Sequence, residues 1–167
     1  MERRLAAILV ADIVGYSRLM NEDEEGTLRA VQDTFKSLID PKALQYRGRI
    51  IKLLGDGALM EFASAVDAVA FAVEVQCAMR ERNGDAPEER RIDYRIGINI
   101  GDIIIEPDDI YGDGVNIAAR LEGLAEPGGI CVASNVFEQV QRKLDLTFNS
   151  MGKRKVKNIA DPISVYQ

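Results

Sequence analysis

The order of the predicted secondary-structure elements makes this 167-residue chain an α+β protein with a ferredoxin-like βαββαβ core. Three observations predict this palm-like fold. A short apolar run over residues 5–13 is typical of a buried strand, apolar residues at steps of three and four mark two helices, and a strand–turn–strand segment lies between those helices. Further strand and helix patterns follow, so we expect additional elements after the core.

The first strand and the first long helix set up the candidate site. The run over residues 5–13 ends at Gly15 and places Asp12 near the carboxyl end of a strand. Apolar residues from 28 to 44 repeat at helical spacing, and Pro41 is expected to interrupt that helix. The acidic run over residues 21–25 precedes it, as expected near a helix start, where the macrodipole favours negative charge.

A hairpin is predicted next, with strands over residues 48–54 and 58–62. Its turn is Gly55-Asp56-Gly57, whose glycines permit positive φ, and we expect Asp56 to be exposed at the tip. Ser64 then opens a second helix, which lasts until about residue 83. With helices on one face of an antiparallel sheet, the first strand lies beside the hairpin, so Asp12 and Asp56 should converge.

The second half of the sequence repeats the alternation of strand and helix. Residues 92–106 predict a long strand or bent hairpin, followed by a turn at residues 107–109 and another strand. An alanine-rich helix follows Gly112 and stops before the Pro-Gly-Gly at residues 127–129. A strand over residues 130–133, a helix from Ser134 and strands in the tail complete the chain.

Composition narrows the class of protein. The length predicts one domain over residues 1–167, and the net charge of −6 argues against a nucleic-acid-binding protein, which needs a basic face. No apolar stretch reaches the roughly 18 residues of a membrane span. We therefore expect a cytoplasmic chain. Cys77 and Cys131 lie in apolar surroundings and are expected in the core.

The chain contains no histidine, which limits its metal chemistry. Many transition-metal sites in proteins use histidine as a ligand, whereas Mg²⁺ prefers carboxylate and phosphate oxygens. Two aspartates brought together at one sheet edge repel each other, and a divalent cation between them keeps both ionised. Asp12 and Asp56 therefore point to magnesium-dependent chemistry on a nucleoside triphosphate.

Four sequence blocks together resemble one known family. They are LVADIVGYS at residues 9–17, IIKLLGDGALMEF at 50–62, DIYGDGVNIAARLE at 109–122 and, more weakly, VKNIADPISVY at 156–166. In this order they resemble the catalytic domain of the class III adenylate and guanylate cyclases, and especially bacterial adenylate cyclases. The resemblance covers nearly the whole chain and implies the fold named above.

The resemblance implies a role for the residues near the two aspartates. Asp12 and Asp56 would bind two Mg²⁺ ions per site, with Mn²⁺ as a substitute, and the carbonyl of Ile13 would be a further ligand. Backbone N–H groups at Gly15, Tyr16 and Ser17, which precede a helix start, would receive phosphate oxygens.

The resemblance also assigns the substrate. Lys52 and Asp109 match the pair that recognises adenine, so ATP rather than GTP is expected. Asn116 matches the residue that orients the ribose, Arg120 the one that stabilises the transition state, and Lys157 the one that contacts the terminal phosphates. In this family a homodimer holds two sites at its interface, each with metal aspartates from one subunit and the remaining residues from the other. The expected product is 3′,5′-cyclic AMP with pyrophosphate.

Two alternatives stay open at this point. A dinucleotide-forming enzyme with the same palm would need a site for guanine and a GG[DE]EF-like block, which the sequence lacks. A silent cyclase-like module would bind nucleotide or a partner and signal by dimerising. Taken singly, each site residue also has a structural explanation: a turn for either aspartate, an edge charge for Lys52, an ion pair for Arg120. A regulatory domain or partner beyond these residues is also possible.

Overall fold

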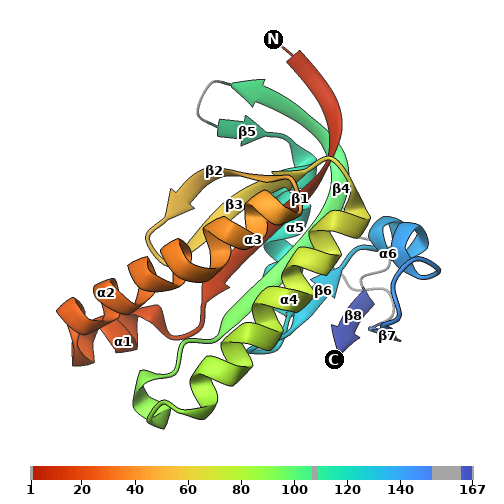
Figure 1. Ribbon diagram of the computed structural model, residues 1–167. Helices are drawn as coiled ribbons and strands as arrows, with labels where there is room; N and C mark the ends of the chain where they lie inside the picture. Colours follow the sequence, from red (N-terminus) through yellow and green to blue (C-terminus); the bar gives the residue numbers. More distant parts are fainter. Residues whose placement is uncertain (1, 107–108, 152–162, 167) are drawn as a thin grey trace.

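The computed structural model describes residues 2–106, 109–151 and 163–166 and contains one mixed sheet with helices on both faces (Figure 1). Four antiparallel strands in the order β2-β3-β1-β4 form its centre. That order is the ferredoxin-like arrangement, so the predicted fold is confirmed. These strands are β1 (Glu2–Ile13), β2 (Gly48–Leu54), β3 (Gly57–Phe62) and β4 (Tyr94–Glu106).

The remaining strands extend the sheet from β4. The carboxyl end of β4 pairs antiparallel with β5 (Asp109–Tyr111), and its earlier part pairs parallel with β6 (Ile130–Val132). Beyond β6 lie β8 (Ile163–Tyr166) and then β7 (Thr147–Ser150). The segment predicted as a long strand or bent hairpin is thus a single strand, β4, which pairs with β1 along its whole length.

The first long helical segment is divided into four consecutive elements. Asp23 caps α2 by accepting a hydrogen bond from the Gly26 N–H, which is why this helix starts earlier than its apolar pattern does. The interruption expected at Pro41 is a π-helical turn just before it, since proline has no N–H to continue the ladder. The segment comprises α1 (Tyr16–Glu22), α2 (Glu24–Thr34), η1 (Phe35–Ile39) and α3 (Asp40–Gln45).

Four further helices follow. Ser64 accepts hydrogen bonds from the N–H groups of Val66 and Asp67, as expected of a cap. These helices are α4 (Ala65–Gly84), the short 3₁₀ helix η2 (Glu88–Arg90), α5 (Asp113–Leu124) and α6 (Ser134–Val140). Among the described residues, no helix is both long and apolar enough to cross a bilayer.

Helices cover both faces of the sheet, so the expectation of one covered face is wrong. Along β1, Ala7, Leu9 and Ala11 belong to the large core shared with α4, whereas Ile8 and Val10 belong to a second core that includes Ala118 of α5. Figure 1 shows α4 in front of the sheet and α5 behind it. Because β1 is apolar on both sides, each side has to be covered. The predicted burial also fails for Cys77, which is exposed, while Cys131 is buried.

Candidate functional site

Asp12 and Asp56 lie side by side where β1 ends. Asp12 pairs with Gly57 in the antiparallel register of β1 and β3, and Asp56 immediately precedes Gly57. The N–H of Ile13 donates a 2.7 Å hydrogen bond to the carbonyl of Asp56. The predicted convergence of the two aspartates is therefore present, and main-chain pairing sets it.

Gly57 allows this close approach. A Cβ at this position would lie only 1.9 Å from the carbonyl oxygen of Ala11 and 2.9 Å from the Cα of Asp12. The expected reason for the turn glycines does not hold, because neither Gly55 nor Gly57 has positive φ. Asp56 is half-buried rather than exposed at the tip, because its peptide pairs with β1. The turn requires glycine at position 57 because the main chain of β1 leaves no space for a side chain there.

Glu122 on α5 is a third carboxyl at this end of the sheet, and sequence reasoning missed it. Its side chain is buried. Burial, the neighbouring Asp12 and, to a smaller extent, Asp56 raise the pKa of Glu122 to about 8, although Arg95 acts in the opposite direction. Arg95 pairs with Asp12 across β1 and β4, so it lies on the same face of the sheet. The sequence does contain one signal for Glu122, because an acidic residue on the apolar side of a predicted helix is unusual and indicates a special environment.

The donors at this end suit a hard divalent cation. Mg²⁺ and Mn²⁺ prefer carboxylate oxygens, and Asp12 and Asp56 bring enough negative charge together to raise the pKa of Glu122. Ile13, the last residue of β1, hydrogen-bonds Asp56 through its N–H and so lies beside both aspartates. In the part of the chain that the structure describes, no three Asp, Glu, His or Cys side chains form a metal site by themselves. A cation held by Asp12 and Asp56 would therefore also need backbone or substrate oxygens.

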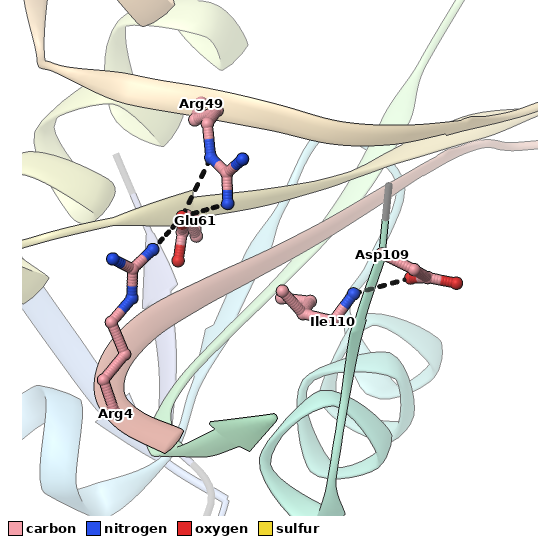
Figure 2. A network of polar contacts seen from close by, with 5 residues as sticks. All are labelled: Arg4, Arg49, Glu61, Asp109 and Ile110. Carbon is pink, nitrogen blue, oxygen red and sulfur yellow. Dashed lines mark hydrogen bonds and ion pairs between the residues drawn. The ribbon is translucent and has the colours of Figure 1, made fainter. Parts of the chain in front are cut away.

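Lys52 and Asp109, which are 57 residues apart, are brought into contact. The Nζ of Lys52 on β2 lies 3.3 Å from Oδ2 of Asp109 on β5. The other carboxylate oxygen of Asp109 accepts a 2.8 Å hydrogen bond from the N–H of Ile110, as Figure 2 shows. A bulge between Ile50 and Lys52 shifts the register of β2 with β3. Bulges re-aim side chains, and this one sets the direction of Lys52.

Asn116 and Arg120 lie on the outer side of α5. The inner side is fixed by Gly97 of β4, where a Cβ would lie 2.3 Å from both the carbonyl oxygen of Ala118 and the N–H nitrogen of Glu122. The buried residues of α5, which include Ala118 and Glu122, therefore face the sheet. At 100° per residue, Asn116 and Arg120 fall on the opposite side of the helix, and both are exposed. They point away from the sheet that carries Asp12.

Three further predicted residues, Gly15, Tyr16 and Ser17, lie at the start of α1. Gly15 has φ 65° and precedes the first residue of the helix, Tyr16, and no side chain caps this end. The first N–H groups of α1, those of Tyr16 and Ser17 among them, therefore have no partner within the helix. Ser17 is exposed and Tyr16 is half-buried. Lys157 lies outside the described residues.

Comparisons with known proteins agree on one family. Residues 2–167 match the model described as the adenylate and guanylate cyclase catalytic domain. The chain is 46% identical over 166 residues to putative adenylate cyclase 3 of Rhizobium meliloti (strain 1021), a match covering 99% of the chain and 28% of that protein. It is 30% identical over 145 residues to an adenylate cyclase of Streptomyces coelicolor, covering 87% of the chain and 36% of that protein.

A solved structure gives the same result. The crystal structure described as adenylate/guanylate cyclase/hydrolase from Silicibacter pomeroyi is 50% identical and superposes with a TM-score of 0.88, covering 99% of this chain and 96% of that one. The chain spans 28% and 36% of the two curated relatives, so it corresponds to one part of each. The chain belongs to the adenylate and guanylate cyclase catalytic domain family.

Proposed function

We propose that the chain is an adenylate cyclase that converts ATP to 3′,5′-cyclic AMP and pyrophosphate at two sites shared by a homodimer. The observation that carries the proposal is the division of the site residues by α5. Asp12 and Asp56 lie in the sheet beneath this helix, whereas Asn116 and Arg120 point outward from it. One copy of the chain therefore contains both groups of residues, but it does not bring the two aspartates together with Asn116 and Arg120.

Two supporting observations concern the same division. Among the described residues, no hydrogen bond or ion pair joins either aspartate to Lys52, Asp109, Asn116 or Arg120. A cavity of about 640 Å³ lies between β4 and the starts of α5 and α6. Neither aspartate lines this cavity, and nor do the other four site residues, so the cavity does not bring the two halves of the site together. A second copy facing α5 would bring its own aspartates to Arg120, and the twofold symmetry of a homodimer makes two such sites.

The Lys52–Asp109 pair supports ATP as the substrate. The lysine offers donors and the aspartate offers acceptors, which matches the ring-nitrogen acceptor and the amino donor of adenine. Guanine presents the reverse pattern at these edges, so binding it would leave a charged group unpaired. Such a mismatch discriminates by orders of magnitude.

The chain's own residues would divide the work of the reaction as follows. Asp12, Asp56 and the Ile13 carbonyl would hold the metal ions, and Asn116 would orient the ribose. When bound, Mg²⁺ supplies a lowered pKa for the 3′-hydroxyl and charge neutralisation for the leaving pyrophosphate. Arg120 would stabilise the charge that develops on the α-phosphate. The N–H groups at Gly15, Tyr16 and Ser17, together with Lys157, would bind the remaining phosphate oxygens.

The proposal is tested by assaying cyclic product from purified protein. ATP or GTP is supplied with Mn²⁺, and specific activity is followed as protein concentration rises. Cyclic AMP that exceeds cyclic GMP, with specific activity rising toward a plateau, supports shared sites. A folded protein that binds ATP but forms no cyclic product would instead be a silent module.

Control by a further region or partner fits the greater length of the curated relatives, and the use of ATP fits a cytoplasmic location.

A further inference from the structure

Two separate parts of the sheet carry the Lys52–Asp109 pair. Lys52 belongs to the hairpin arm, which is β2 with β3. Asp109 belongs to the β5 arm, which is β5 with the carboxyl end of β4 and the beginning of β1. The arms separate at Ala7, the first β1 residue paired with β3; earlier β1 residues pair with β4. The geometry of the pair therefore depends on what holds the two arms together.

A network of three charged side chains crosses between the arms. Arg49 and Glu61 face each other across β2 and β3, and Oε1 of Glu61 accepts hydrogen bonds of 2.9 and 2.6 Å from the Nε and Nη2 of Arg49. The same oxygen accepts a hydrogen bond from Arg4 on β1. Figure 2 shows Glu61 between the two arginines. Two ion pairs among the described residues thus join the arms, Arg4–Glu61 and Lys52–Asp109.

The hydrogen bonds of this network are not those expected if its only role were to stabilise the fold. The Glu61 side chain is only 7% exposed, and both arginines bind one of its oxygens, while the other is buried without a hydrogen-bond partner among the described residues. Burial tends to raise the pKa of Glu61, but the two guanidinium groups hold it below its ordinary value. A buried carboxylate of this kind contributes little net stability, whereas it does define a geometry.

We propose that Arg4, Glu61 and Arg49 are positioning residues for base recognition. Arg49 fixes the start of β2 immediately before the bulge that directs Lys52, and Arg4 ties this hairpin arm to the β5 arm that carries Asp109. Loss of the Arg4–Glu61 ion pair should let Lys52 and Asp109 move apart. The property expected to change most is the preference for adenine over guanine. The inference rests on the proposed role of the Lys52–Asp109 pair.

The test compares four proteins by their affinities for ATP and GTP. Arg4→Gln removes the link between the arms but leaves the Arg49–Glu61 pair intact, and Arg4→Lys keeps the charge. Lys42→Gln is the matched control, because it removes an ion pair of 2.8 Å to Glu74 that joins α3 to α4, on the other face of the sheet. Affinities are measured by displacement of a fluorescent ATP analogue, together with kcat and urea unfolding.

We expect Arg4→Gln to lower the ATP-to-GTP affinity ratio about tenfold, with kcat at saturating ATP within about twofold of wild type. Arg4→Lys should regain most of the ratio, and Lys42→Gln should keep the wild-type value. A folded Arg4→Gln protein with an unchanged ratio, or an equal change in Lys42→Gln, would overturn the inference. Wild-type protein that prefers ATP but forms no cyclic product would refute only the proposed catalysis, whereas no preference for ATP would refute both.

Discussion

The candidate site has two ends that are held in different ways. The metal end is proposed at Asp12 and Asp56, and the base-recognition end is proposed at Lys52 and Asp109. At the metal end, Asp12 and Asp56 are adjacent because main chain pairs with main chain, and Gly57 leaves no space between β1 and the turn. At the base-recognition end, Lys52 and Asp109 meet through long side chains carried by two arms, and half of the Lys52 side chain is exposed. The metal end is set by backbone, and the base-recognition end by side chains.

This difference predicts how each end responds to substitution. A main-chain contact with no free volume cannot be altered without moving a strand, so the metal end should tolerate almost no substitution. The Lys52–Asp109 ion pair, in which the lysine is half exposed and the aspartate 21% exposed, can be altered at modest cost to stability. We therefore expect changes at the metal end to affect folding and activity together, and changes at the base-recognition end to affect mainly the choice of nucleotide.

The largest effect is expected for Gly57→Ala. The new Cβ would overlap the carbonyl of Ala11, so β1 and the turn must separate, at a cost of about 2–4 kcal/mol in the free energy of unfolding. Gly55→Ala in the same turn is the matched control, because a Cβ there meets nothing within 4 Å. Urea unfolding of both variants measures the difference. Equal stabilities would show that the turn is not tightly packed against β1.

A smaller and more selective effect is expected for Lys52→Gln. The substitution replaces the charged donor proposed for adenine with a shorter, neutral amide and leaves Asp109 without its ion pair. The ratio of kcat/KM for ATP to that for GTP should fall by about 10- to 100-fold, with little change in stability. Exposed Lys36 serves as the control, as Lys36→Gln should leave the ratio unchanged. An unaltered ratio in Lys52→Gln would remove base recognition from this end.

A third effect depends on pH and concerns Glu122. Its pKa of about 8 lies above the ordinary value of 4.5, so between these values the folded protein binds more protons than the unfolded chain. Stability from this group is full below about pH 4.5 and is lost as pH rises toward 8, by at most about 1.4 kcal/mol per pH unit. Urea unfolding of wild type and Glu122→Gln from pH 5 to 8 isolates this term.

Added Mg²⁺ gives a second measurement of the same group. A cation at Asp12 and Asp56 offsets the charges that raise the pKa of Glu122, so the difference between wild type and Glu122→Gln should depend less on pH when Mg²⁺ is present. Arg95, the nearby positive group, is present in both proteins and does not affect the comparison. A difference that is the same with and without Mg²⁺ would argue against a cation at the two aspartates.

Sequence reasoning reached the metal end more fully than the rest of the site. The βαββαβ order puts the first strand beside the hairpin, so Asp12 and Asp56 could be placed together from periodicity and turns alone. The role of Gly57 could not, because a glycine in a sequence does not show whether it supplies positive φ or space. Lys52 and Asp109 were paired only through resemblance, since no local pattern links residues 57 apart.

The features that were missed depend on the second covered face. Glu122 meets the aspartates because α5 lies against β4 at Gly97, and Arg95 meets Asp12 because β4 pairs with β1. Periodicity reveals neither contact. The Arg4–Glu61–Arg49 network likewise requires knowing where β1 leaves β3. In both cases a residue's surroundings come from a strand distant in sequence, and a single sequence carries little information about such contacts.

Mixing two inactive variants tests the shared site most directly. Asp12→Ala lacks a proposed metal ligand and Arg120→Ala lacks the outward-facing arginine, so each should be inactive alone. In a mixed dimer one of the two sites combines the intact Asp12 of one copy with the intact Arg120 of the other, so an equal mixture should recover about a quarter of wild-type activity. Mixed dimers that are isolated with two different affinity tags and still form no cyclic AMP would contradict a site divided by α5 between two copies.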